Sequence, residues 1–177
     1  MCRKPSLLSD VFCSCIPIAS FTVCAKSLTD GYYTLQNPKE NPGKITLITR
    51  FGADKVSTLL PPILREVQKS GLPVVWCCDP CHGNTFTSKT GYKTRSFDSI
   101  LREIEETFKV HRDNGSRLNG VHIELTGEHV TECTGGPEGL LETDLPRRYT
   151  TLCDPRLNYA QSLEVSLTEI LLLDRRR

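Results

Sequence analysis

Short β-branched runs alternate along the chain with segments whose apolar residues recur at helical spacing. The runs predict strands at residues 44–49, 73–77, 120–125 and 149–153. The helical spacing predicts three helices: one capped by Asp54 and ending at Ser70–Gly71, one at 98–111, and one that starts after Asn158. Pro61 and Pro62 fall within the first helix, where they predict a kink or a late start.

This alternation predicts an α/β fold with a parallel sheet and right-handed crossovers. We interpret it as four successive strand–loop–helix units, which form either the second half of a TIM-type (β/α)8 barrel or a small doubly wound sheet. Sites in such folds lie at the C-terminal ends of the strands. Each predicted strand here is followed by a residue capable of chemistry, namely Arg50, His82, Glu124 and Asp154.

Residues 1–36 do not share the pattern and are treated as a poorly defined N-terminal segment, separate from the α/β region at 37–177. Arg3 and Lys4 precede an apolar stretch at 11–19, which is the layout of a signal peptide, and the segment is also Ser-rich and poor in acids, as transit peptides are. Pro17 and the serines weaken the first interpretation. A poorly ordered leader is the alternative, and no function is assigned to this segment.

Composition narrows the class of protein. The chain of 177 residues is 38% hydrophobic and 24% charged, as expected of one soluble domain. A net charge of +1 argues against a nucleic-acid partner, and no apolar run approaches the roughly 20 residues that span a membrane. The nine cysteines are an odd number in a chain of this size, which argues against a disulfide framework. We therefore expect a reducing compartment, the cytoplasm, with a plastid as the alternative.

The stretch from Val74 to Thr85 concentrates reactive side chains. Cys78 to His82 matches the C-x-x-C-H pattern of c-type haem attachment, and with Trp76 it also echoes the Trp-Cys-x-x-Cys of thioredoxin-like proteins. Both interpretations are weak, because a loop rather than a helix follows Cys81 and the only methionine, a candidate axial ligand, is Met1. A zinc site that uses these cysteines is a third alternative, although no second Cys/His pair stands nearby.

His82, Glu124 and Asp154 form a more coherent set. Each lies at or just past a predicted strand end, and in a barrel these ends converge, so the three could share one ion. One imidazole and two carboxylates suit Mn²⁺, Co²⁺ or Zn²⁺. Taken singly, each residue has an ordinary structural explanation, such as a turn-forming Asp before Pro155. Their recurrence at the same structural position gives the metal hypothesis equal standing with these explanations.

Cationic residues accompany the candidate ligands. Arg50 follows the first predicted strand and could hold a phosphate or carboxylate through a bidentate fork. Lys93 and Arg95 add positive charge in the long loop, where ordinary solvated side chains are the alternative. A metal together with several cations at one barrel mouth indicates a phosphorylated substrate.

Specific motifs follow one another in order between about Asn37 and about Leu172. They stand at residues 41–44 (Asn-Pro-Gly-Lys), 52–55 (Gly-Ala-Asp-Lys), 78–85 (Cys-Asp-Pro-Cys-His-Gly-Asn-Thr), 91–95, 120–128, 130–133, 148–149, 153–158 and 161–164. Together they resemble class II (plant-type) 3-deoxy-D-arabino-heptulosonate-7-phosphate (DAHP) synthase, and the resemblance covers what looks like its C-terminal half.

The resemblance implies a metal-dependent transferase with a (β/α)8 barrel. Such an enzyme condenses phosphoenolpyruvate with erythrose 4-phosphate in the first step of the shikimate pathway, towards chorismate and the aromatic amino acids. His82, Glu124 and Asp154 correspond to metal ligands, with Mn²⁺ the first expectation and Co²⁺ or Zn²⁺ the alternatives. Arg50 corresponds to a phosphoenolpyruvate-binding arginine, and Lys93 falls in the loop near the erythrose phosphate. No catalytic acid or base is assigned.

The chain also departs from the family pattern. The family's fourth metal ligand is a cysteine from the first half of the barrel, and residues 1–36 contain no motif that matches it. A half barrel would expose sheet edges, so the expected partners are small phosphorylated molecules and either a homo-oligomer or a complementary barrel half. A catalytically incomplete remnant that binds metal or phosphate, or acts as an interaction module, is the first alternative. A cysteine-based redox or zinc module is the second.

Overall fold

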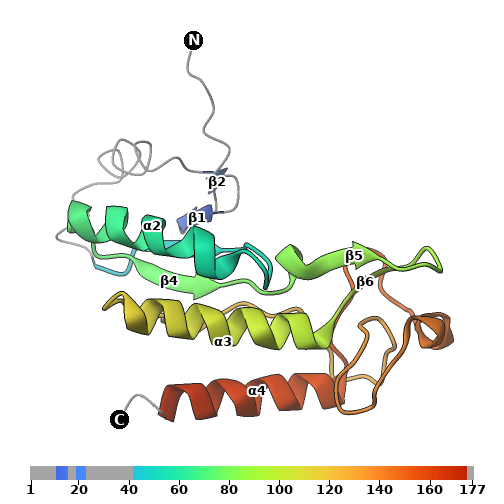
Figure 1. Cartoon of the computed structure of the whole chain (residues 1–177). Helices are drawn as coiled ribbons and strands as arrows, with labels where there is room; N and C mark the ends of the chain where they lie inside the picture. The colour runs from blue at the N-terminus through green and yellow to red at the C-terminus, as the bar shows by residue number, and fades with distance from the viewer. Residues whose placement is uncertain (1–10, 16–18, 23–41, 175–177) are drawn as a thin grey trace.

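The structure, a computed structural model, describes residues 11–15, 19–22 and 42–174 and contains a five-stranded sheet (Figure 1). Its strand order is β2-β1-β3-β4-β7. The strands are β1 (Val11–Cys15), β2 (Ala19–Thr22), β3 (Ile45–Thr49), β4 (Val75–Cys78) and β7 (Gly120–Val121). β3, β4 and β7 are parallel, whereas β1 is antiparallel to both β2 and β3. The predicted α/β class with parallel strands is therefore confirmed, and β1 covers one edge of the parallel part.

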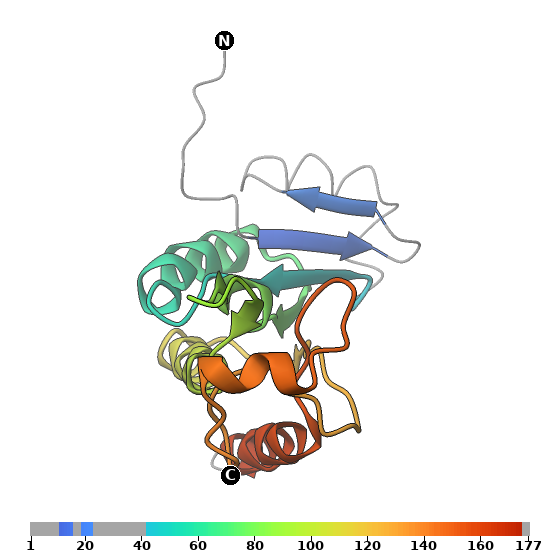
Figure 2. The same cartoon turned by 90° about the vertical axis from the view of Figure 1, so that its right-hand side faces the viewer.

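The described residues contain three α-helices: α2 (Val56–Ser70), α3 (Phe97–Asp113) and α4 (Tyr159–Asp174). α3 contacts both α2 and α4, and the two views place α4 at the end of the molecule opposite to β1 and β2 (Figures 1 and 2). Buried residues of β3, β4, α2 and α3 form the core, among them Leu47, Trp76, Leu60, Leu64, Ile100 and Ile104. In the part of the chain described, no helix combines the length and the apolar character needed to cross a membrane.

α2 confirms a predicted helix but begins differently. Its buried face carries apolar residues at helical spacing, and Gly71 ends it in the left-handed conformation (φ 63°) that favours glycine. It starts at Val56, before both prolines, so the late start does not occur. Asp54 is not the cap: the helix follows Lys55 without a capping side chain, and the exposed Asp54 instead pairs with Arg102 at 2.6 Å.

α3 and α4 begin at side-chain caps. The hydroxyl of Ser96 accepts a hydrogen bond from the Ser99 nitrogen at the start of α3. The predicted cap Asn158 is confirmed, since its Oδ1 accepts from the Gln161 nitrogen at 3.0 Å and its own nitrogen donates to Gln161 Oε1 at 3.1 Å. This reciprocal pair is a capping box, which satisfies N–H groups that a helix start leaves without partners.

Two of the four predicted units are wrong in part. The third strand is only Gly120–Val121, and the loop predicted after it contains a 3-10 helix, η2 (Glu142–Arg147). The fourth strand at 149–153 does not form. Instead Leu157 makes an isolated parallel bridge with Leu125, because the segment before it wraps around a buried carboxylate described below.

The long loop after β4 contains structure that the sequence did not predict. It forms a 3-10 helix, η1 (His82–Asn84), followed by a hairpin of β5 (Thr85–Thr87) and β6 (Lys93–Arg95). Gly91, at φ 86°, closes the turn of this hairpin. The hairpin returns the chain towards the C-terminal ends of the parallel strands, where the candidate site residues lie.

Candidate metal centre

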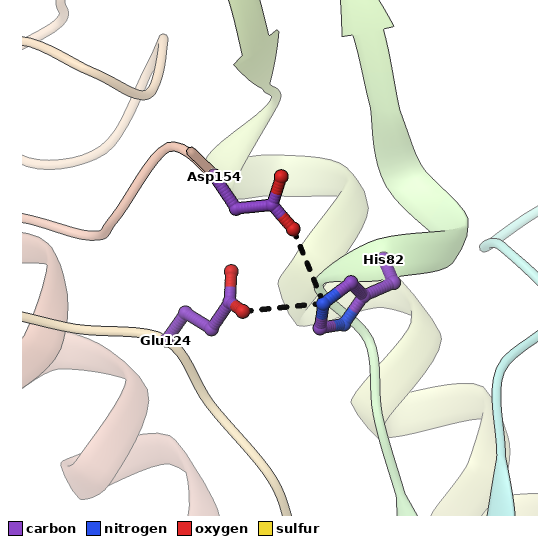
Figure 3. A group of neighbouring side chains, drawn as sticks. All are labelled: His82, Glu124 and Asp154. Atoms are coloured by element: carbon purple, nitrogen blue, oxygen red, sulfur yellow. Dashed lines mark ion pairs between the residues drawn. The ribbon is translucent and has the colours of Figure 1, made fainter. Parts of the chain in front are cut away.

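His82, Glu124 and Asp154 converge from three different segments, as Figure 3 shows. His82 opens η1 after β4, Glu124 follows β7, and Asp154 lies in the loop before α4. His82 Nε2 is 3.1 Å from Glu124 Oε1 and 3.3 Å from Asp154 Oδ2. One potential ligand atom from each of the three side chains lies within 4.8 Å of the other two. Among the described residues, no other group of three or more His, Cys, Asp or Glu side chains meets this criterion.

The spacing of these atoms fits one divalent ion. Nitrogen and oxygen ligands lie about 2.0–2.2 Å from a metal such as zinc, so two ligands at about 90–110° are about 2.8–3.6 Å apart. The two measured separations, 3.1 and 3.3 Å, fall in this range. Two carboxylates balance the charge of a divalent cation, and the three side chains are each about one quarter exposed, so an ion and a small substrate could reach them.

Asp79 fixes the orientation of His82. Its side chain is fully buried, and its Oδ2 accepts a hydrogen bond from His82 Nδ1 at 2.8 Å, while Oδ1 accepts from the nitrogens of Cys81 and His82. A proton held on Nδ1 leaves the lone pair on Nε2, the nitrogen that faces Glu124 and Asp154. Burial raises the pKa of Asp79, but the hydrogen bond from His82 and the Arg50 guanidinium outweigh it and leave that pKa below its usual value.

Arg50 shares the same carboxylate. Its Nε and Nη2 donate to Asp79 Oδ2 at 2.9 and 2.6 Å, and its side chain is 28% exposed. Asp79 thus links the candidate anion-binding arginine to a candidate metal ligand. Asp79 was not identified from the sequence. A signal was present, because an Asp side chain commonly accepts hydrogen bonds from the backbone N–H groups two and three residues later in a turn.

Arg95 is not the solvated loop residue that was one alternative. It is fully buried, its Nη1 binds Glu124 Oε2 and the Pro155 carbonyl, and its Nε donates to Thr85 Oγ1 at 2.9 Å. Its Nη2 has no hydrogen-bond partner and lies 3.5 Å from Asp154 Oδ2. The Arg95 guanidinium therefore lies beside both carboxylates of the site.

Lys93 lies on the rim of the same site. Its ammonium pairs with Asp154 Oδ1, its side chain is about half exposed, and the hydroxyl of Tyr149 donates to its carbonyl at 2.6 Å. The hydrogen bond from Lys93 lowers the pKa of Asp154. The site therefore holds two carboxylates, one imidazole and three cationic side chains.

Comparison with known protein families identifies the family of this chain. The family model described as the class-II DAHP synthetase family matches residues 22–169, a match that starts before the first of the motifs quoted above. The chain belongs to the class II DAHP synthetase family.

Three curated relatives agree with this assignment. A stretch of 135 residues is 52% identical to the phospho-2-dehydro-3-deoxyheptonate aldolase AroG of Mycolicibacterium smegmatis, covering 76% of this chain and 29% of that protein. The phospho-2-dehydro-3-deoxyheptonate aldolase of Neurospora crassa is 53% identical over 132 residues (73% and 27%), and that of Streptomyces coelicolor is 46% identical over 135 residues (76% and 30%). The chain spans less than a third of the length of these relatives.

In this class II chain, a second buried carboxylate shapes the loop that carries Asp154. Glu132 is fully buried and accepts hydrogen bonds from the nitrogens of Thr150, Thr151 and Arg156, and from the Arg156 guanidinium at 2.8 and 3.0 Å. Burial raises the pKa of Glu132, but these hydrogen bonds outweigh it and lower that pKa overall. The backbone amides that a fourth strand would have needed are bound to this side chain instead.

Two of the three cysteines of the central stretch, Cys78 and Cys81, belong to the hydrophobic core. Cys78 and Cys81 are fully buried, Cys77 is half-buried, and the ligand group contains none of them. Burial raises the pKa of Cys78 well above its usual value and that of Cys81 to about 11. Because the thiolate is the metal-binding and nucleophilic form, these values disfavour both cysteine-based alternatives.

Proposed function

We propose that this chain carries the metal-binding part of a class II DAHP synthase, which condenses phosphoenolpyruvate with erythrose 4-phosphate to DAHP and phosphate. The convergence of His82 and Glu124, which follow parallel strands, with Asp154 from the loop before α4 supports this most directly. Family membership supports it independently, because the similar proteins are named phospho-2-dehydro-3-deoxyheptonate aldolases.

We assign one divalent metal to His82 Nε2 and the carboxylates of Glu124 and Asp154, with Mn²⁺ the first choice and Co²⁺ or Zn²⁺ the alternatives. When bound, such an ion supplies a Lewis acid that polarises the aldehyde oxygen. Asp79 keeps the proton of His82 on Nδ1, Arg95 holds the outer oxygen of Glu124, and Lys93 pairs with the outer oxygen of Asp154. These neighbours orient the ligands without touching the ion.

The cationic residues hold the anionic substrates in this proposal. Arg50 binds phosphoenolpyruvate, and Lys93 contacts the phosphate of erythrose 4-phosphate. Carbon 3 of phosphoenolpyruvate forms the new bond to the aldehyde carbon, water adds at carbon 2, and phosphate leaves. Holding both substrates near one another and screening their charges accounts for much of the rate enhancement.

We further propose that β3, β4 and β7 are successive strands of a (β/α)8 barrel and that a complementary segment supplies the remaining strands. Each of the three is followed by a site residue, as in barrel enzymes. The relatives are more than three times as long as the part that they share with this chain. The same segment would supply the cysteine that completes the ligand set in this family.

Metal binding and phosphate release test the proposal separately. The purified chain should bind Mn²⁺ in an electron paramagnetic resonance titration, and His82→Ala should abolish that binding. Phosphate release from the two substrates should appear only when the complementary part of a relative is added. Absence of Mn²⁺ binding would overturn the metal site, and robust turnover by the chain alone would overturn the half-barrel arrangement.

A second candidate function is binding without catalysis, supported by a ligand group, His82, Glu124 and Asp154, that can hold an ion without any assigned acid or base. It also predicts that the chain binds Mn²⁺. It differs in that no complementary segment restores phosphate release, so the same assay separates the two candidates.

A further inference from the structure

The loops that follow β3 and β4 touch each other through two glycines. A Cβ added to Gly83 would lie 2.4 Å from the Gly52 nitrogen, and one added to Gly52 would lie 2.8 Å from the Gly83 oxygen. Gly52 also has φ +85°, a conformation that favours glycine. The first loop carries Arg50, two residues before Gly52, and the second carries His82, next to Gly83, so this backbone contact adjoins both candidate site residues in the sequence.

The carboxylate of Glu103, on α3, binds both loops from within the core. Its Oε1 accepts hydrogen bonds from the nitrogens of Phe51 and Gly52, each at 3.0 Å. Its Oε2 accepts from Asn84 Nδ2 at 2.7 Å. Asn84 in turn accepts from the Ala53 nitrogen at 3.0 Å and donates to the Pro80 carbonyl at 2.8 Å. One side chain thus joins the end of η1 to the loop after β3.

Stability alone does not explain a carboxylate at this position. Glu103 is 0% exposed, and the hydrogen bonds found for it in the described structure come from two backbone amides and one neutral side chain. A buried charge is expensive to desolvate, and apolar side chains of similar volume often stabilise a core as well or better. What the carboxylate offers is geometry, since both of its oxygens accept and can face two sets of donors at once.

We propose that Glu103 is a positioning residue that sets the separation of the Arg50 and His82 loops. Asp79 joins the Arg50 and His82 side chains, and Glu103 joins the backbone of the first loop to the Asn84 side chain of the second. With both links the loops cannot pivot about either one. The inference rests on the proposed function, because the separation matters only if Arg50 binds a substrate anion beside the ion that His82 holds.

Glu103→Gln tests this with little change of size. The amide nitrogen of glutamine must face either the backbone N–H groups of Phe51 and Gly52 or the amide of Asn84, so a donor opposes a donor in both orientations. Asn84→Ala removes the same link from the other side and serves as a second variant should glutamine fail to fold. Glu105→Gln, an exposed glutamate on the same helix, is the matched control.

The measurements are the affinity for Mn²⁺ alone and, at saturating Mn²⁺, the affinity for phosphoenolpyruvate by titration calorimetry. We expect Glu103→Gln and Asn84→Ala to leave the Mn²⁺ affinity within about threefold and to weaken phosphoenolpyruvate about tenfold or more, the effect of one hydrogen bond to a charged group. The control should match the wild type in both.

Each other result decides against a claim. Unchanged phosphoenolpyruvate affinity in both variants would overturn the positioning role and leave the proposed function intact. Equal loss of both affinities would also overturn it, because Glu103 would then hold the whole site rather than the separation of two loops. A wild-type chain that binds neither probe would overturn the proposed function, and this inference with it.

Discussion

Asp79→Asn removes the charge that links Arg50 to His82 while keeping the shape of the side chain. Oδ1 accepts from the backbone nitrogens of Cys81 at 3.1 Å and His82 at 3.2 Å, so the oxygen of asparagine takes this side. Its amide nitrogen then lies where Oδ2 accepts from His82 Nδ1 at 2.8 Å and from Arg50 Nη2 at 2.6 Å. In the variant a donor therefore faces Arg50 and the nearer side of His82 Nδ1, which keeps only its longer contact, 3.0 Å, to the Oδ1 position.

The imidazole relieves this conflict by moving its proton from Nδ1 to Nε2, which removes the lone pair that faces Glu124 and Asp154. Loss of the partner behind a metal-bound histidine costs about 10- to 100-fold in metal affinity. At about 1.4 kcal/mol per factor of ten, this is about 1.4–2.8 kcal/mol. Arg50 loses its two hydrogen bonds to Asp79 Oδ2 in the same variant, so phosphoenolpyruvate binding should also weaken.

A Mn²⁺ titration followed by electron paramagnetic resonance measures this directly, with wild type, Asp79→Asn and His82→Ala in parallel. Asp54→Asn is the matched control, because it makes the same chemical change in a side chain that is 83% exposed and pairs with Arg102. Exposed pairs contribute about 0–1 kcal/mol to stability, so this variant should bind Mn²⁺ as the wild type does.

Two outcomes would refute the reasoning. If Asp79→Asn binds Mn²⁺ with wild-type affinity while His82→Ala does not bind it, His82 does not depend on Asp79 for its tautomer. If Asp54→Asn weakens binding as much as Asp79→Asn, the overall charge of the protein, and not the position of the carboxylate, controls the affinity.

Three further outcomes are expected. The pKa of Glu132 is lower in the folded state, so this residue stabilises the fold above its unfolded pKa and loses that contribution as the pH falls. In Glu132→Gln, the free energy of unfolding measured in urea should therefore fall less steeply than in the wild type below about pH 4.5. The same pH dependence in both proteins would contradict this. Gly83→Ala should lower the free energy of unfolding by more than about 1 kcal/mol because its Cβ meets backbone at 2.4 Å, whereas Gly127→Ala, with nothing within 4 Å, should change it by less than about 0.5 kcal/mol. Replacing Cys78 or Cys81 by alanine should leave the Mn²⁺ affinity of the folded protein within about threefold of wild type, because neither belongs to the ligand group; loss of binding would favour a cysteine-based site.

The elements that the sequence predicted well are those with a strong repeating pattern. α2 and α3 bury residues at helical spacing, and β3 and β4 are β-branched or aromatic runs next to turn signals. Because the predicted strands were parallel, the residues after them could be placed at one edge of the sheet, and this brought His82 and Glu124 together correctly. The hydrophobic pattern can predict these elements and the edge of the sheet where the site lies, because it depends only on which face of an element each residue buries.

The errors arise where a distant side chain overrides local preference. Tyr149 to Cys153 has the composition of a strand, yet Glu132, 18 and 19 residues earlier in the sequence, binds the amides of Thr150 and Thr151. Asp154 therefore reaches the site on a loop and not at a strand end. Arg95 is a similar case, since only the folded chain shows two carboxylates and a carbonyl around its guanidinium.

These cases share a physical basis with the rest of the site. The fold buries four charged residues next to the site: Asp79, Arg95, Glu103 and Glu132. Each of them is bound to a segment that carries a candidate ligand or substrate-binding residue. A buried charge is weak evidence for stability, and four around one centre make a case for positioning, because a charge with several partners allows few alternative loop arrangements. Conservative substitutions of these four residues should therefore weaken metal or anion binding before they destabilise the fold. The same substitutions of exposed charged residues should not.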